Sequence, residues 1–319
     1  MSDAMTTTGS VGFDQTAYDR MAYFALRPEL HYDQIADVQP TRQSMPGSAV
    51  VFTQVADMAV VTTAISESVD IDAVAISDAN VTVTLVEYGN AVNTTKKLRA
   101  TSYIEVNPVV ANVIGFNAGR SIDSVAEITV RGGSNVRYAG VATARNTVTP
   151  TDTLKAANVR RARAELAGAN VAPNRGGYYT AFIHPDVTYD FTGETGAAAW
   201  RDPHTYSQPE NIWQAEIGAF EGFTFIETPR APMFADAGSS TTLTDVYATI
   251  FTGQQAIAKA FSNAEGLGPT PRVIMSPVVD KLKRFVPIAW YHLVGYARFR
   301  EAALRRVESA STIGANAAA

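Results

Sequence analysis

The chain has 319 residues, of which 46% are hydrophobic and 18% charged, and its formal net charge is −5. The hydrophobic fraction can bury a substantial core, and the length corresponds to about two domains. A dedicated nucleic-acid binder usually has a strong basic excess to neutralise phosphates, so the acidic balance predicts that any contact with nucleic acid is weak or local. The absence of cysteine excludes disulfides, thiolate metal sites and cysteine nucleophiles.

The two ends of the chain contain no obvious targeting or membrane segment. The apolar stretch at residues 21–26 is short and is followed by Arg27 and Pro28, which differs from a signal sequence. The later run at residues 285–299 contains Arg298 and is shorter than the roughly 20 residues of a membrane helix. We therefore expect a soluble protein with no membrane partner.

Residues 1–12 are small and polar, and we expect them to form a disordered tip. Residues 13–39 carry scattered aromatic side chains without a helical or strand period. Such a segment buries its aromatic side chains by lying on something else, either the domain body or another subunit.

Residues 41–95 are acidic and rich in β-forming residues. No Lys or Arg occurs between Arg42 and Lys96. Valine and leucine at 81, 83 and 85 alternate with threonine, a period typical of strands. We predict a long acidic β-hairpin, which is either a solvated surface feature or an arm that docks on a basic surface of a neighbouring copy. The candidate contact residues on it are Asp57, Glu67, Asp70 and Asp72.

Two helices are predicted in the middle of the chain. Asn107 is a suitable N-cap and Pro108 a suitable first residue for a helix over 108–131, which Gly132 and Gly133 end. Its length of roughly 35 Å is typical of a structural spine. The second helix runs to about Gly168, with its apolar side at 159, 162 and 166.

The remaining elements follow from alternation, turn residues and charge. They are a strand at 178–183 that His184 and Pro185 interrupt, a hairpin at 216–228 around Gly222, a strand at 246–251, a helix at 254–261, a linker at 263–271, strands over 272–298 and a short helix at 298–308. The order of elements predicts an α+β protein in which one domain is inserted within another.

The sequence contains few residues whose spacing favours catalysis or metal binding. His184, Asp186, Asp202 and His204 could form a metal site with two histidines and two carboxylates, but no two of them have the spacing of a helical ligand pair. The glycine-rich phosphate-binding patterns and the GxSxG nucleophile motif are absent. We predict no catalytic, cofactor-binding or metal-ligating residues and no cofactor.

Basic residues form clusters that have two interpretations. They either keep the protein soluble, or one cluster receives the acidic hairpin of a neighbouring copy and another faces nucleic acid. The candidate residues are Arg160, Arg161 and Arg163 on the second helix, Lys281, Lys283 and Arg284 near a strand, and Arg298, Arg300, Arg305 and Arg306 near the end.

Several stretches resemble major capsid proteins of tailed bacteriophages that infect actinobacteria. The resemblance covers roughly residues 13–300. The stretches are residues 23–28 (Tyr-Phe-Ala-Leu-Arg-Pro), 41–44 (Thr-Arg-Gln-Ser), 82–91 (Thr-Val-Thr-Leu-Val-Glu-Tyr-Gly-Asn-Ala), 181–186 (Ala-Phe-Ile-His-Pro-Asp), 217–223 (Ile-Gly-Ala-Phe-Glu-Gly-Phe) and 227–232 (Glu-Thr-Pro-Arg-Ala-Pro).

The resemblance implies the Hong Kong 97-like capsid fold. The parts of that fold would be an N-terminal arm (1–44), an extended hairpin called the E-loop (45–80), a peripheral domain (81–149) with a spine helix (108–131), an axial domain (150–265), a return to the peripheral domain (266–310) and a loose tail (311–319). Some shells of this fold form an isopeptide crosslink from an E-loop lysine, but the proposed E-loop here has no lysine. We therefore expect a shell without that crosslink.

The implied function is self-assembly into the hexamers and pentamers of an icosahedral phage head around double-stranded DNA. The implied partners are other copies of the chain, scaffold, portal and decoration proteins, and non-specifically bound DNA. Assembly would take place in the cytoplasm of the host bacterium, and the product would be the virion capsid. Three alternatives stay open: the shell of a cellular nanocompartment, a metal-dependent hydrolase, and a phage tail or adhesin subunit.

Overall fold

The computed structural model describes residues 31–38, 49–195, 216–263, 268–275 and 282–313, apart from gaps at 56–57, 66, 69, 72, 103–105, 175, 242 and 283. The tip predicted at residues 1–12 and most of the predicted arm lie outside this part of the chain. The described strands form a five-stranded sheet, a seven-stranded sheet and a separate two-stranded hairpin. Together with the helices they give the mixed helix and strand architecture expected from the sequence.

The five-stranded sheet is built around one long strand, β13 (Phe285–Arg298). Strand β4 (Val86–Thr95) pairs with it on one side, and β11 (Ile257–Phe261) and β12 (Arg272–Met275) pair with it on the other. Strand β1 (Ala36–Val38), which follows the 3₁₀ helix η1 (Asp33–Ile35), adds to β11 in parallel. Alternate residues of β13 are buried because only one face of this part of the sheet is covered.

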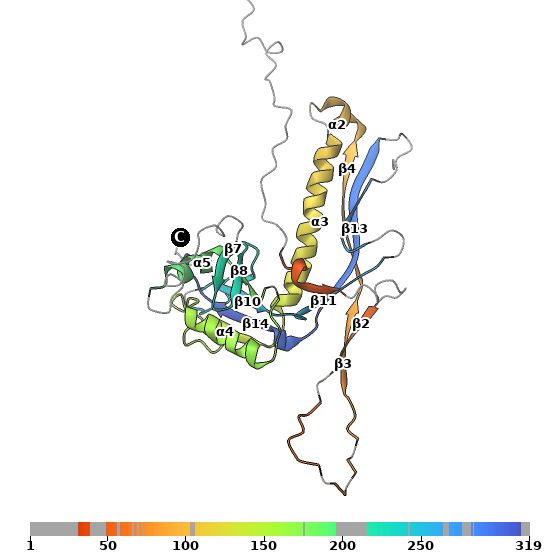
Figure 1. The fold of residues 1–319 in the computed structure, drawn as a ribbon. Coiled ribbons are helices and arrows are strands. Elements are labelled where there is room, and N and C mark those ends of the chain that lie inside the picture. Colours follow the sequence, from red (N-terminus) through yellow and green to blue (C-terminus); the bar gives the residue numbers. More distant parts are fainter. Residues whose placement is uncertain are drawn as a thin grey trace, which may run out of the picture.

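The covering element is α3 (Val106–Arg131), which runs along β4 and β13 (Figure 1). Ile114, Ala118 and Ile122 lie one helical turn apart and pack against Ile288, Trp290 and Val294 of β13. The helix predicted over 108–131 is confirmed, although it begins at Val106, one residue before the predicted N-cap. It ends at Arg131 as predicted, and Gly133 follows with a φ of 97°, a conformation that favours glycine. The short helix α2 (Lys96–Thr101) precedes it.

The seven-stranded sheet holds the largest core. Its order is β5 (Val136–Tyr138), β14 (Leu304–Ser309), β10 (Val246–Thr252), β6 (Tyr179–Ile183), β8 (Phe223–Glu227) and β7 (Glu216–Phe220), and β9 (Met233–Phe234) pairs with β10. Every residue of β6 and β10 is buried. Phe223, Phe225 and Phe251 pack edge to face in this core.

Two helices belong to this second part of the molecule, α4 (Ala156–Gly168) and α5 (Pro185–Gly193) (Figure 1). Helix α4 buries Val159, Ala162 and Leu166, the side that the sequence predicts. Helix α5 is not among the elements predicted from the sequence. His184 is its N-cap, and its Nδ1 accepts a hydrogen bond from the backbone N–H of Asp186 at 3.2 Å, while Pro185 occupies the first helical position.

Two predicted helices are wrong. Residues 257–261 form the buried strand β11 between β1 and β13, because a short apolar run does not by itself distinguish strand from helix. Residues 298–308 contain the end of β13, the 3₁₀ helix η5 (Glu301–Ala303) and the strand β14. The charges that suggested a solvated helix here are mostly held in ion pairs.

The chain crosses between the two sheets several times. It passes from α3 to β5, returns from β10 to β11 and crosses again from β13 to β14. Sheet membership therefore differs from the predicted domain ranges at β5, β11 and β14. The described structure also contains the two-stranded hairpin and the 3₁₀ helix η2 (Arg145–Thr147).

Candidate functional site

The most extended feature of the molecule is the hairpin of β2 (Ala49–Val55) and β3 (Asp78–Thr84), which projects away from both sheets (Figure 1). The two strands are antiparallel, with Ala49 opposite Thr84 and Val55 opposite Asp78. The predicted β-hairpin is thus confirmed. The described residues within 58–77, which we call the hairpin loop, lie between the two strands.

The root of the hairpin is fixed to the five-stranded sheet. Val50, Phe52 and Val83 form a buried cluster with Ala258 and Ala260 of β11 and with Phe299. The rings of Phe52 and Phe299 have centroids 5.9 Å apart. Because this contact is apolar and buried, the hairpin has a defined direction relative to the sheet.

The hairpin loop exposes apolar side chains that this subunit does not cover. Their exposed fractions range from 57% to 88% for Met58, Val60, Val61, Ile65, Ile71, Val74 and Ile76. Exposed apolar groups at this density are typical of a surface that binds another protein. Glu67 and Asp70, two of the predicted contact residues, are exposed on the same loop, whereas Asp57 and Asp72 lie outside the described residues.

A buried carboxylate anchors residues 31–38 to the body. Oδ1 of Asp123 on α3 accepts hydrogen bonds from the backbone N–H groups of His31, Tyr32 and Asp33, at 3.1, 2.8 and 3.4 Å. Its Oδ2 lies 3.0 Å from Nη2 of Arg230, which balances the charge. The Tyr32 ring is completely buried against Phe182, with 4.5 Å between centroids.

A second set of polar contacts, around Asp33, connects residues 31–38 to the five-stranded sheet. Nζ of the buried Lys259 on β11 lies 2.7 Å from Oδ1 of Asp33, and the hydroxyl of Tyr296 donates to the same oxygen. Burial and the Asp33 charge raise the pKa of Tyr296 above its usual range. Burial and, secondarily, the Lys259 charge lower the pKa of the neighbouring His292 to about 4, so this imidazole is neutral at pH 7.

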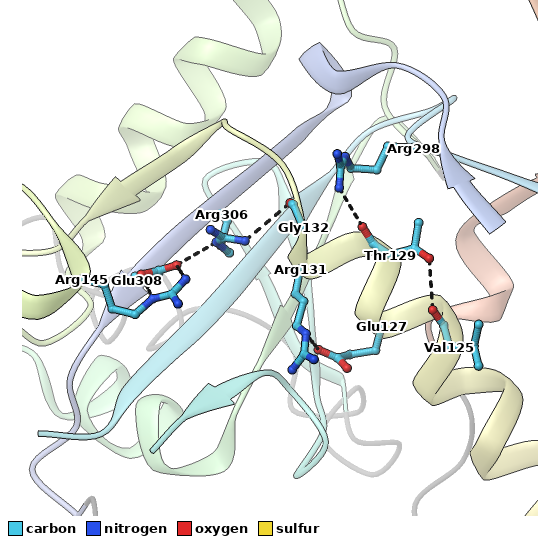
Figure 2. A network of polar contacts seen from close by, with 9 residues as sticks. All are labelled: Val125, Glu127, Thr129, Arg131, Gly132, Arg145, Arg298, Arg306 and Glu308. Carbon is cyan, nitrogen blue, oxygen red and sulfur yellow. Dashed lines mark hydrogen bonds and ion pairs between the residues drawn. The ribbon is translucent and has the colours of Figure 1, made fainter. Parts of the chain in front are cut away.

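The end of α3 and strand β14 meet in a network of ion pairs (Figure 2). Arg145 holds the fully buried Glu308 with two hydrogen bonds of 2.8 and 2.7 Å. Nε of Arg306 lies 2.8 Å from the same carboxylate, and Arg306 also donates to the carbonyl of Gly132 at 3.5 Å. Arg298 reaches the carbonyl of Thr129 near the helix end, at 3.4 Å.

The structure separates the predicted basic cluster on α4. Arg161 points toward Glu165, at 3.3 Å, whereas Arg163 reaches Glu221 at 3.8 Å on another side of the helix. Arg160 is exposed. Near the second cluster, Arg284 lies over the ring of Phe285 at 5.3 Å, while Lys281 and Lys283 lie outside the described residues.

Two further candidate residues, which no sequence pattern groups with Arg161, lie beside it. Arg137 of β5 and Arg305 of β14 also contact Glu165, at 2.9 and 3.3 Å. These residues come from three distant parts of the sequence, and no local pattern connects them. Arg137, Glu165 and Arg305 border a cavity of about 350 Å³ that Ser134, Asn135, Gly168 and Ala169 also line, and Arg161 lies beside it through its contact with Glu165.

The candidate metal residues have other roles where they are described. His184 caps α5 and lies 3.4 Å from Asp186, which in turn accepts a hydrogen bond from the Tyr247 hydroxyl at 2.8 Å. Within the described ranges no three histidine or carboxylate side chains are grouped as metal ligands. Asp202 and His204 lie outside those ranges. No described helix has the length and apolarity needed to cross a membrane.

Comparisons with known proteins agree on one class. The family described as phage capsid protein matches residues 7–313. The capsid of Ralstonia phage GP4 is similar in structure, with a TM-score of 0.77, 13% sequence identity, and coverage of 97% of this chain and 98% of that one. The capsid asymmetric unit of cyanophage Pam1 is similar with a TM-score of 0.75 and 11% sequence identity, and the match covers 98% of this chain and 100% of that one. A chain of Mycobacterium phage Che8 is similar with a TM-score of 0.64 and 12% identity, and the match covers 93% of this chain and 97% of that one. No match is found among curated proteins.

Proposed function

The chain belongs to the phage capsid protein family, and we propose that copies of it form hexamers and pentamers that close into an icosahedral head around double-stranded DNA. The family establishes a structural role in a capsid, and the similar structures establish a Hong Kong 97-like fold. A single observation supports assembly through the hairpin: the loop at residues 58–77 exposes seven aliphatic side chains that its own subunit leaves uncovered. Burying them against another copy would supply a driving force for association.

We assign parts of the fold to roles in the shell. The hairpin is the E-loop, which reaches over a neighbouring copy, and α3 is the spine of the peripheral domain together with the five-stranded sheet. The seven-stranded sheet belongs to the axial domain, which surrounds the centre of each capsomer. The segment at residues 31–38, which Asp123 holds against α3, belongs to the proposed N-terminal arm. Heterologous contacts of this kind build closed rings.

The charge distribution suits a container. The net charge of −5 would keep contacts with packaged DNA weak and non-specific. The hairpin has no lysine, so we propose that the shell is held by buried area and charge without an isopeptide crosslink from the E-loop. Scaffold, portal and decoration proteins are further proposed partners, and host cytoplasm is the proposed place of assembly.

A structural role also accounts better for the polar residues than an enzymatic one. The described members of the candidate metal site, His184 and Asp186, cap a helix and bind Tyr247. We therefore propose that the protein is not an enzyme and uses no cofactor.

The test is assembly of the purified chain, followed by size-exclusion chromatography and negative-stain electron microscopy. We expect capsomer rings or closed particles from the unaltered chain. Val61→Asp in the hairpin loop should shift the protein to folded monomers, because a carboxylate would have to be buried at the contact.

Val141→Asp is the matched control, since Val141 is equally apolar and 92% exposed but lies on the body. It should assemble like the unaltered chain. If Val61→Asp assembles as well as Val141→Asp, the hairpin is not an assembly contact. If the unaltered chain stays monomeric at high concentration, the proposal that the chain assembles by itself is wrong.

A further inference from the structure

Three guanidinium groups share a single carboxylate beside the cavity between α4, β5 and β14. Oε1 of Glu165 accepts hydrogen bonds from Nε of Arg137 at 2.9 Å and from Nε of Arg161 at 3.3 Å. Nε of Arg305 lies 3.3 Å from Oε2. One negative charge therefore faces three positive charges, and the group, which we call the arginine pocket, keeps a positive excess.

The shared carboxylate also orients two of the arginines. Arg137 and Arg161 both donate to Glu165 through Nε, so these hydrogen bonds do not use their terminal nitrogens. Within the part of the chain that the structure describes, no acceptor is assigned to those terminal nitrogens. Their side chains are 51% and 66% exposed, so both guanidinium forks are accessible to a ligand. Such forks bind planar oxyanions with two parallel hydrogen bonds.

A helix end lies beside the pocket, and Arg300 offsets its effect on an anion. The C-terminal end of α4 would by itself repel negative charge, since its last carbonyl groups point outward. Arg300 offsets this effect by donating to the carbonyls of Ala169 and Asn170, at 2.9 and 3.4 Å. The cavity of about 350 Å³ leaves room for an incoming side chain.

We propose that the arginine pocket receives the carboxylates of Glu67 and Asp70 from the hairpin loop of a second copy. This inference rests on the proposed function. The loop fits the pocket because it is acidic and because residues 43–95 contain no lysine or arginine that would be repelled. The two exposed carboxylates also match the two positive charges in excess.

A protein carboxylate fits this pocket better than DNA. Arg305 is only 14% exposed and lies at the inner side of the pocket, where a narrow side chain can approach. Non-specific DNA binding instead uses cations spread along a surface that follows many phosphates. A grouping of three arginines around one carboxylate differs from such a surface.

The absence of cysteine in the chain allows a direct test. Ser68→Cys lies between the two loop carboxylates and keeps both. Gly168→Cys lies at the pocket and keeps all the arginines, and a Cβ at Gly168 would meet no atom within 4 Å. Assembled particles of the double variant should form disulfides between copies under mild oxidation, seen as a ladder on a non-reducing gel, because a disulfide needs Cα atoms within about 7 Å.

The matched control is Ser68→Cys with Gly193→Cys. Gly193 also ends a helix and also has open space at its Cβ, but it lies on α5. It should give no ladder. Particles that form normally without a ladder for the Gly168 pair would overturn the inference and leave the proposed function standing, whereas absence of particles from the unaltered chain would overturn the proposed function.

Charge reversal provides the second measurement. Arg137→Glu with Arg161→Glu should raise the concentration needed for assembly at least about tenfold, since like charges at a contact cost more than 1.4 kcal/mol. Adding Glu67→Arg and Asp70→Arg to that variant should restore assembly. Normal assembly of the reversed variant with reduced DNA retention would overturn the proposal and assign the pocket to phosphate.

Discussion

At the scale of single residues, the molecule depends on buried charges that each have a partner. Asp123 binds three backbone N–H groups and Arg230, and Lys259 binds Asp33. Buried ionised groups are tolerated only when such partners replace water. His292 differs, because it is 1% exposed and its Nε2 has no hydrogen-bond partner among the described residues.

This environment makes stability dependent on pH through His292. Burial, with Lys259 as the second cause, lowers its folded-state pKa to about 4, below the unfolded value of about 6.5. Between pH 6.5 and pH 4 the unfolded chain therefore binds a proton that the folded chain does not. The free energy of unfolding should fall by up to about 3 kcal/mol as the pH is lowered through this window, with no further loss from His292 below it.

Urea unfolding at pH 7, 5.5 and 4.5 measures the effect. His292→Gln cannot take up this proton, so its free energy of unfolding should decrease less over the same range. His31→Gln, at a half-exposed position, should behave like the unaltered chain. Equal pH dependence in the unaltered chain and in His292→Gln would contradict the assignment.

At the scale of elements, the hairpin root depends on a close crossing of β3 over β13. A Cβ at Gly295 would lie 2.2 Å from the carbonyl oxygen of Thr84 and 2.9 Å from Cγ1 of Val83. Gly295→Ala should therefore push β3 away from the sheet and destabilise the root by roughly 1–3 kcal/mol. Hydrogen exchange should become faster in residues 49–55 and 78–84, while β10 stays protected.

Gly115→Ala is the matched control for this substitution. Gly115 lies within α3, and a Cβ there would meet nothing within 4 Å. Alanine should stabilise the helix by about 0.5–1 kcal/mol, because glycine is unfavourable in a helix interior. Unchanged exchange in the hairpin of Gly295→Ala would show that the root does not need the close crossing.

At the scale of the whole molecule, buried ion pairs join β14 of the seven-stranded sheet to η2, and a hydrogen bond joins β14 to the end of α3, the helix that covers the other sheet (Figure 2). Glu308 of β14 is completely buried between Arg145 and Arg306, and Arg306 also contacts Gly132 beyond the helix. Removing the carboxylate leaves two cations close together in a partly buried site. Breaking such a group by deleting one partner costs about 3–5 kcal/mol.

Glu308→Ala should therefore lower the Tm by many degrees in a thermal unfolding experiment. Glu301→Ala is the control, because Glu301 also pairs with an arginine, Arg298, but its side chain is 37% exposed. The control should cost about 1 kcal/mol or less. Similar Tm values for the two variants would mean that the buried Glu308 ion pairs contribute no more stability than the exposed Glu301 pair.

Several features could be predicted from the sequence because their cause is local. The period of apolar residues and the paired glycines predict α3, and strict alternation with a lack of basic residues predicts the acidic hairpin. The exposed positions of Glu67 and Asp70 follow from the same reasoning. The predicted contacts of these residues with a neighbouring copy remain proposals.

Other features were decided only by the tertiary structure. Residues 257–261 and 304–309 are strands because sheet partners lie beside them, which neither their short apolar run nor their charges indicate. The sequence placed Arg161 with Arg160 and Arg163, but folding places it with Arg137 and Arg305 around Glu165. Periodicity and charge within a segment determine which elements form and which face is apolar. Contacts between distant segments determine which charges share a site, because electrostatic partners depend on separation in space and not along the chain.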